Sequence, residues 1–300
     1  MLLGIVSHLL SCAPAPAGRF SAVGGFAAGK LWSLGGGERG LEPTPEVWSL
    51  DLEGLAWTRH DDAPENVYRA TATWDGSTFL VFGGDTGEGL SDHLWRFDPA
   101  DASWTSLGSG PPPRYKHAAF WMDDQLWIHG GMGDDGLRDD VWRWDGEWHE
   151  VAAGPEPLYR QSVTVPAEGP AVVFAGIGDD GRHAKLWTFD GASFAEVAYG
   201  DGPGERASHC AWTVDAGVAT ALGDGDDASL WTWDGTAWAE HAADPEPPVR
   251  DAAICAQDGE DLYVLGGDLF AEDLPDFGVD LWRWRDGAWT ELLGPKGLPE

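Results

Sequence analysis

The chain has 300 residues, 43% of them apolar, so it can bury a large core. Asp and Glu number 51 against 18 Lys and Arg, which gives a net charge of −33. A surface of this charge repels nucleic acids and anionic membranes, and this excludes both as direct partners. The three cysteines are too few for a disulfide framework.

The N-terminal stretch is typical of export. An apolar run ends at Leu10, and Ser11, Cys12 and an Ala/Pro spacer follow. This resembles a bacterial lipoprotein signal in which Cys12 is acylated, although no Lys or Arg precedes the apolar run. We expect residues 1–18 to be signal and spacer, and the protein to be secreted or a lipoprotein of the cell envelope. Any membrane contact would be through the lipid alone, because no later segment has the ~18 uncharged apolar residues of a spanning helix.

Six tryptophan-rich stretches then follow one another along the chain. They are VWSLDLEGLAWTRH (47–60), LWRFDPADASWTSL (94–107), VWRWDGEWHEV (141–151), LWTFDGASFAEV (186–197), LWTWDGTAWAEH (230–241) and LWRWRDGAWTEL (281–292). The last aromatic residue of each stretch recurs every 44 to 51 residues, at Trp57, Trp104, Trp148, Phe194, Trp238 and Trp289. A period near 46 fits the four-stranded blade of a propeller.

Within each unit the pattern predicts four short strands. A strand-like run comes first, then an apolar strand that ends near a glycine pair, a polar loop, the tryptophan strand, a tight turn and a final strand. No segment has a helical period. The sequence therefore predicts an all-β fold, a six-bladed β-propeller of four-stranded antiparallel blades. The expected blades are 19–63, 64–110, 111–154, 155–202, 203–246 and 247–293, followed by a tail, 294–300.

Glycine pairs and tryptophans give the repeat its family resemblance. The pairs are Gly35-Gly36, Gly83-Gly84, Gly130-Gly131 and Gly266-Gly267, and the third-strand tryptophans are Trp48, Trp95, Trp142, Trp187, Trp231 and Trp282. Ala175 and Leu222 replace the first glycine in units four and five. The pattern resembles the kelch-repeat family of propellers, an architecture also associated with the central domain of galactose oxidase. We expect most tryptophans to fill the wedge between blades, rather than to form a sugar-binding platform.

Four units carry an arginine 16 residues before the first glycine position: Arg19, Arg114, Arg206 and Arg250. In the other two units the arginines slip, Arg160 by one residue and Arg69 by two. The kelch resemblance implies that the first strand is innermost, which would place the four arginines at the channel mouth. Two roles are open: binding a carboxylate or other anion, or pairing with loop carboxylates and carbonyls, which the acidic excess favours.

His117 and His209 stand three residues after Arg114 and Arg206. They could join the arginines in a ligand site like that of a sialic-acid mutarotase, but Arg-x-x-His is also ordinary kelch sequence. The spacing of tyrosines, histidines and cysteines gives no copper site of the galactose oxidase kind, and we assign no catalytic residue.

The longest loop offers a possible cation site. Glu272, Asp276 and Asp280 recur every four residues and could collect Ca²⁺. The spacing resembles the Glu-xxx-Asp-xxx-His iron motif of plant specifier proteins, which are also kelch propellers, but Asp280 stands where histidine is required. We therefore expect no cofactor, with Ca²⁺ as the one candidate.

The two remaining cysteines have different positions in their units. Cys210 follows Arg206 by four residues, and Cys255 follows Arg250 by five. In matched strands these side chains would face opposite sides of the sheet. The sequence therefore predicts two buried free cysteines.

The loops after the second and fourth strands differ most in length and are rich in Asp, Glu and Gly, so their rim is the candidate functional face. We expect a monomeric, non-catalytic binding or scaffold protein whose protein or glycan ligand docks there. The alternative is an enzyme acting on a small anionic sugar at the arginine-lined mouth. Arginines that point unpaired into an open funnel would favour the enzyme.

Overall fold

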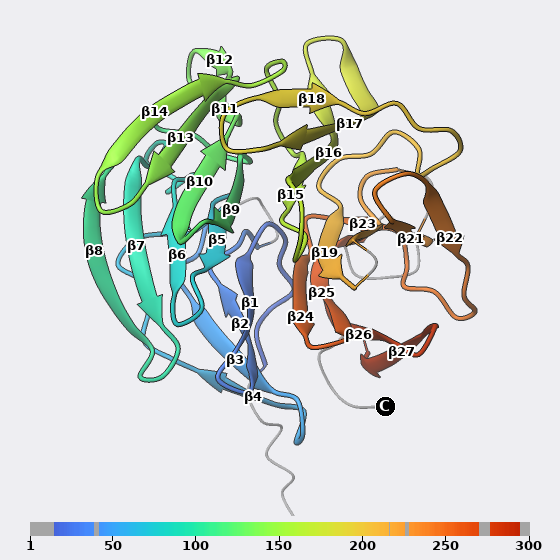
Figure 1. Cartoon of the computed structure of the whole chain (residues 1–300). Helices are drawn as coiled ribbons and strands as arrows, with labels where there is room; N and C mark the ends of the chain where they lie inside the picture. The colour runs from blue at the N-terminus through green and yellow to red at the C-terminus, as the bar shows by residue number, and fades with distance from the viewer. Residues whose placement is uncertain (1–14, 39–41, 216, 226–227, 270–276, 295–300) are drawn as a thin grey trace, which may run out of the picture.

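Six antiparallel sheets surround a central axis (Figure 1). The computed structural model describes residues 15–38, 42–215, 217–225, 228–269 and 277–294, and its elements there are strands without helices. Each sheet is built from one continuous stretch of sequence, and the innermost strands contact one another around the whole ring, from the first blade to the sixth. The predicted six-bladed β-propeller is confirmed.

The strands occupy equivalent positions in the six blades. The innermost strands are β1 (Val23–Ala27), β5 (Thr71–Trp74), β9 (Ala118–Met122), β15 (Ser162–Thr164), β19 (Cys210–Val214) and β24 (Ile254–Asp258). The second strands are β2 (Lys30–Leu34), β6 (Phe79–Phe82), β10 (Gln125–His129), β16 (Ala171–Gly178), β20 (Gly217–Ala221) and β25 (Asp261–Leu269).

Toward the outside follow the tryptophan strands and the edge strands. The third strands are β3 (Val47–Asp51), β7 (His93–Asp98), β13 (Asp140–Trp144), β17 (Gly181–Phe189), β21 (Leu230–Trp233) and β26 (Phe277–Arg285). The outermost are β4 (Ala56–Arg59), β8 (Ser103–Ser109), β14 (Trp148–Ala153), β18 (Phe194–Glu196), β22 (Trp238–His241) and β27 (Ala288–Leu293). Three short strands, β11 (Met132–Gly133), β12 (Gly136–Leu137) and β23 (Arg250–Asp251), lie on the connections.

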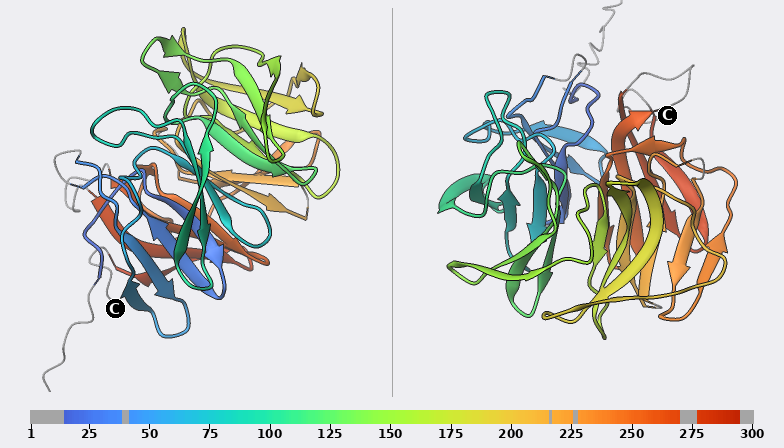
Figure 2. Two further views of the ribbon diagram at one scale, coloured as in Figure 1. Left: turned by 90° about the vertical axis from the view of Figure 1, so that its left-hand side faces the viewer. Right: turned by 90° about the horizontal axis from the view of Figure 1, so that it is seen from above.

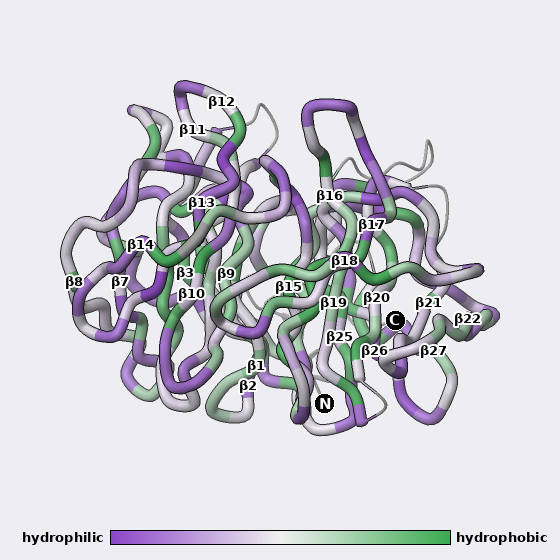
Figure 3. Tube along the Cα trace, turned by 45° about the horizontal axis from the view of Figure 1, so that its top comes forward, coloured by the Kyte–Doolittle hydropathy of each residue, from purple (hydrophilic) through white to green (hydrophobic). Residues whose placement is uncertain are grey.

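Because successive strands alternate in direction, the connections gather at two rims (Figure 2). The rim that carries the connections after the second and fourth strands also holds the β11–β12 hairpin. Connections such as those between β11 and β12 and between β16 and β17 are hydrophilic, whereas apolar residues follow the strands (Figure 3).

The core is divided into layers between blades. Six apolar clusters each join two neighbouring blades and so cover all six interfaces. Between the first two blades, for example, Trp32 packs against Phe79 and Phe97. Ten of the 19 tryptophans are buried and no described tryptophan is fully exposed. Each buried indole removes roughly 150–250 Å² from water, so the predicted wedge-filling role is confirmed and a tryptophan platform is disfavoured.

The glycine positions require a left-handed backbone. Gly35 and Gly36 have φ of 66° and 103°. Where the first glycine is missing, Ala175 and Leu222 keep the same conformation, with φ of 56° and 63°. A side chain there costs on the order of 1–2 kcal/mol, and the surrounding blade contacts outweigh this cost.

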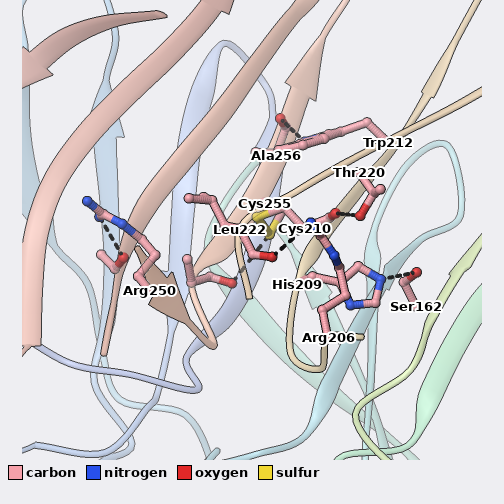
Figure 4. Close-up of a disulfide and its surroundings, with 12 residues drawn as sticks. Ser162, Arg206, His209, Cys210, Trp212, Thr220, Leu222, Arg250, Cys255 and Ala256 are labelled. Atoms are coloured by element: carbon pink, nitrogen blue, oxygen red, sulfur yellow. Dashed lines mark hydrogen bonds between the residues drawn. A yellow bond between two sulfur atoms is a disulfide. The ribbon is translucent and has the colours of Figure 1, made fainter. Parts of the chain in front are cut away.

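The predicted free cysteines are wrong, because Cys210 and Cys255 form a disulfide with a Cα–Cα distance of 5.4 Å (Figure 4). The strands β19 and β24 belong to neighbouring blades, not to one sheet. Opposite faces of neighbouring blades face each other across their interface, so side chains predicted to diverge converge instead. The bond links the fifth and sixth blades.

Replacing both Cys210 and Cys255 by Ala is expected to lower the free energy of unfolding by roughly 2–4 kcal/mol, because the disulfide restrains the unfolded chain. Urea unfolding at neutral pH measures the loss. A reducing agent should destabilise the native protein to a similar degree and leave the double variant unchanged. An equal effect of the reducing agent on both proteins would contradict this assignment.

Candidate functional site

A closed circle of backbone hydrogen bonds surrounds the channel. Just before each innermost strand, one residue donates its N–H to the carbonyl of the equivalent residue in the preceding blade, with N···O distances of 2.8 to 3.2 Å. We call these six residues the channel ring: Ser21, Arg69, Lys116, Arg160, Ser208 and Ala252. All six are left-handed, with φ between 50° and 60°. The shared backbone geometry makes their positions strictly comparable.

The channel ring has two unlike halves. Blades two, three and four contribute Arg69, Lys116 and Arg160, which we call the cationic arc. The other three blades contribute only Ser or Ala. All three arc residues line a cavity of about 290 Å³ at the centre of the ring. In a chain with 51 acidic and 18 basic residues, three neighbouring cations form a local positive site.

Tyrosines precede the arc residues and hold the arginines in place. The Arg69 guanidinium lies 4.5 Å from the ring centroid of Tyr68 and 5.6 Å from that of Tyr115. Arg160 lies 5.7 Å from the ring centroid of Tyr159. These distances are those of cation–π contacts, which orient the guanidiniums without neutralising their charge.

Two carboxylates approach one end of the arc. Nη1 of Arg160 lies 3.2 Å from Oδ2 of Asp251 and 3.8 Å from Oδ2 of Asp224. Burial raises the pKa of Asp251, and this effect outweighs the opposing charges of Lys116 and Arg160. Nε of Arg160 is buried and has no hydrogen-bond partner among the described residues. Arg160 therefore has one N–H that the described protein groups leave unsatisfied.

Lys116 stands at the middle of the arc. Burial, followed by the charge of Arg160, lowers the pKa of Lys116 to about 7, although Asp251 and Asp224 oppose the shift. No acidic group of the described residues forms an ion pair with its amine. Lys116 is thus an amine that exchanges its proton near neutral pH.

The four arginines predicted to line the mouth are buried within the blades instead, with 0–4% exposure. In Arg19, Arg114, Arg206 and Arg250, Nε donates to the carbonyl two residues earlier. Nη1 of each donates to the carbonyl 16 residues later, at the first glycine position. These contacts hold the start of the innermost strand against the end of the second.

Carboxylates complete this arrangement in three blades. Arg114 is bidentate to Asp140 at 2.5 and 2.7 Å, and Arg250 is bidentate to Asp280 at 2.8 and 2.7 Å. Arg19 contacts Glu46 at 2.7 Å. The structure thus gives these arginines internal partners. Ligand binding by them stays a prediction, and a different set of cations faces the channel.

A second circle of hydrogen bonds explains the slipped arginines. The carbonyls of the four buried arginines accept from the second glycine position of the preceding blade, and in blades two and four Val67 and Leu158 do so instead. Val67 and Leu158 therefore take the place of the buried arginine, and Arg69 and Arg160 belong to the channel ring. Sequence reasoning missed them by treating them as displaced copies. The apolar residue two places earlier was the available signal.

His117 and His209 line the same cavity but face neighbouring blades. Nε2 of His117 lies 2.8 Å from Oγ1 of Thr71. Nε2 of His209 lies 2.7 Å from Oγ of Ser162 (Figure 4). Burial, followed by the nearby arginine, lowers the pKa of both to about 3. The histidines are therefore neutral and join blades two to three and four to five.

Of the three residues in the predicted cation site, only Asp280 lies within the described residues. Both carboxylate oxygens of Asp280 are engaged by Arg250, and Trp282 also donates to one of them. Glu272 and Asp276 lie outside the described residues, as does the predicted lipidation site, Cys12. Within the described ranges no group of three metal-binding side chains converges. Ca²⁺ binding by this loop stays a prediction.

Comparison with known proteins places the fold. The family model described as the KLHDC2/KLHL20/DRC7 Kelch-repeats domain matches residues 8–151. A solved structure titled "Structure of YjhT" superposes with a TM-score of 0.72 at 15% sequence identity, covering 92% of this chain and 98% of that one. The kelch-repeat model thus matches about the first half of the chain, and the whole chain has the fold of a kelch-type β-propeller. No curated protein sequence matches it.

Some residues recur from blade to blade, and others occur in a few blades only. Glycine pairs, third-strand tryptophans and buried arginines recur around this kelch propeller and serve the repeat. The cationic arc occurs in consecutive blades on one side only. The arc is therefore the feature that distinguishes one side of the channel from the other, and a kelch fold is consistent with its use in binding.

Proposed function

We propose that this kelch propeller is a non-catalytic binding protein that holds the carboxylate of an acidic glycan at the channel mouth. The cationic arc is the observation that carries the proposal. Guanidinium groups bind carboxylates by charge-assisted, forked hydrogen bonds, and Arg160 retains an unused donor among the described residues. A binding role agrees with the kelch fold in general.

The dimensions of the site favour a sugar end group over an extended protein surface. The cavity of about 290 Å³ is at the small end of ligand pockets. The loops after the second and fourth strands surround the mouth and would contact the rest of the glycan chain. Because the net charge of −33 repels anions at long range, selectivity for a carboxylate would come from short-range contacts in the arc.

Replacing Arg69 and Arg160 by Gln is expected to weaken binding of an acidic oligosaccharide about tenfold or more, because each charge-assisted hydrogen bond contributes roughly 1.5–3 kcal/mol. An array of uronic-acid and sialic-acid oligosaccharides beside their neutral parents selects the probe, and titration calorimetry gives its dissociation constant.

Arg143→Gln is the matched control, since Arg143 lies on β13, away from the cavity, and contacts Gln125 and Asp145. It should bind like the native protein. Equal binding by the arc variant, or a ligand that proves to be a protein held only by the acidic rim loops, would overturn the proposal.

An enzyme acting on a small anionic sugar is the second candidate. Lys116 and Asp251 favour it, because both have pKa values moved toward neutrality and lie in one polar cavity. Anomeric exchange of a sialic acid, followed by NMR, is the test. Acceleration that is lost in Lys116→Met and Asp251→Asn would establish catalysis. Exchange at the uncatalysed rate would reject it.

We also propose that the protein is exported. The Cys210–Cys255 disulfide supports this, because disulfides persist in oxidising compartments. The described residues include no helix suited to crossing a bilayer. Mass spectrometry of the purified native protein tests the lipid anchor. An acyl chain on Cys12 would establish it, and an intact, unmodified residue 1–18 segment would reject it.

A further inference from the structure

Lys116 differs from Lys185 in its surroundings. The sequence contains only four lysines, at positions 30, 116, 185 and 296. Lys185 is bound to Glu156 at 2.6 and 2.9 Å. Lys116 instead projects from the channel ring between two arginines and lines the central cavity. Its ring neighbours are cations and its amine has no ion-pair partner among the described residues, which suits a nucleophile better than a structural cation.

We propose that Lys116 is a nucleophilic amine that forms an imine with an aldehyde or ketone entering the channel, and that the arc selects carbonyl compounds bearing a carboxylate. A 2-oxo acid has both groups on adjacent carbon atoms. The proposal goes beyond reversible glycan binding and rests on the proposed function only for the selection of the carboxylate.

The neighbours of Lys116 determine both properties. Arg69 and Arg160 occupy the adjacent ring positions on either side and attract the carboxylate. Asp251 and Asp224 lie close to Nη1 of Arg160. Their negative charges partly offset the arc and favour the protonated form of Lys116. His117 is neutral, and burial raises the pKa of Tyr68, so its hydroxyl adds no negative charge at neutral pH. Burial and the charge of Arg160 are thus the largest influences that favour the neutral amine, and Asp251 opposes them.

The amine is available at neutral pH. With a pKa of about 7, about half of Lys116 is unprotonated at pH 7, against about one in 2,500 for an ordinary lysine. Only the neutral amine has the lone pair needed for attack. Its lower basicity reduces its intrinsic nucleophilicity, but by less than the gain in neutral fraction, so Lys116 should remain the fastest-reacting lysine.

The chemistry balances without an added oxidant or reductant. The lone pair of Nζ attacks the carbonyl carbon, a C–N bond forms and the C=O π pair moves to oxygen. Proton transfer gives a carbinolamine. Loss of water then breaks the C–O bond and forms the C=N bond, and the departing water carries the carbonyl oxygen and the two hydrogens of the neutral amine. Hydrolysis reverses every step.

Reductive trapping tests the imine. The full-length protein is incubated at pH 7 with glyoxylate and cyanoborohydride, and peptide mapping measures carboxymethylation at each lysine. Lys116 is expected to react about tenfold or more faster than Lys30 and Lys185, which are internal controls in the same sample. Equal rates at the three lysines, or a slower rate at Lys116, would overturn the proposal.

Two further measurements separate this inference from the proposed function. The trapping rate at Lys116 should rise with pH and level off above about pH 7, and Arg160→Gln should move this inflection to higher pH. Acetaldehyde, a neutral probe, should react more slowly than glyoxylate at Lys116 but not at Lys30. Fast trapping at Lys116 with no preference for glyoxylate over acetaldehyde would support the nucleophile and reject carboxylate binding by the arc. Glycan binding without preferential trapping would do the reverse.

Discussion

Arg250→Met is expected to lower the free energy of unfolding by about 3–5 kcal/mol. Arg250 and Asp280 have exposed fractions of 0% and 1%, and they form a bidentate pair. Removal of the guanidinium leaves the carboxylate of Asp280 buried without its cation. Nε1 of Trp282 still donates a hydrogen bond to it. An uncompensated buried charge is among the most costly defects a single substitution can create.

Urea unfolding of Arg250→Met is compared with that of Arg143→Met, the control. Arg143 and Asp145 are about one-third exposed and lie 3.7 Å apart, so the control should lose less than about 1 kcal/mol. Adding Asp280→Leu to Arg250→Met should recover part of the loss, because the stranded charge is gone. Similar losses in both arginine variants would refute the structural role given to Arg250.

Lowering the pH from 6.5 to 5 is expected to destabilise the protein by roughly 5 kcal/mol. His117, His209 and His129 are buried, and burial lowers their pKa values to about 3, 3 and 4. Unfolding restores a pKa near 6.5, so the unfolded chain takes up protons that the folded chain excludes. The stabilisation that comes from these neutral histidines is complete well above pH 6.5. It falls as the pH drops from 6.5 toward their pKa values in the folded protein, by roughly 1 kcal/mol per histidine and pH unit.

Urea unfolding at half-unit pH steps gives the slope. The double variant His117→Gln, His209→Gln should retain about one-third of it, whatever its absolute stability. His149→Gln is the control, because His149 lies on the exposed strand β14 and is 42% exposed. An unchanged slope in the double variant, or a flat profile in the native protein, would show that these histidines are not held neutral.

The architecture was predictable because the repeat appears six times in one chain. Each glycine pair marks the end of a second strand, and each third-strand tryptophan marks the next, so the blades could be aligned without any knowledge of their contacts. The tryptophan role followed in the same way. A single copy of the VWRWDGEWHEV stretch would have indicated only a hairpin.

The site was harder to predict because it depends on positions two residues apart in the repeat. Arg114 and Arg69 look like register variants of one residue, yet one is fully buried against Asp140 and the other lines the channel. The backbone circle reveals their difference, and it exists only when the blades close. The cysteine prediction failed for the same reason, since offset parity describes one sheet and says nothing of two sheets facing each other.

The circle of hydrogen bonds also separates the scaffold from its lining. Every N–H and carbonyl in it is used by the main chain, so a substitution at any of the six ring positions alters what the channel presents while leaving the closure intact. Six side chains, one per blade, can thus be exchanged around a common axis without using the groups that close it. The same frame could be given a negative, neutral or aromatic interior by changing those positions alone.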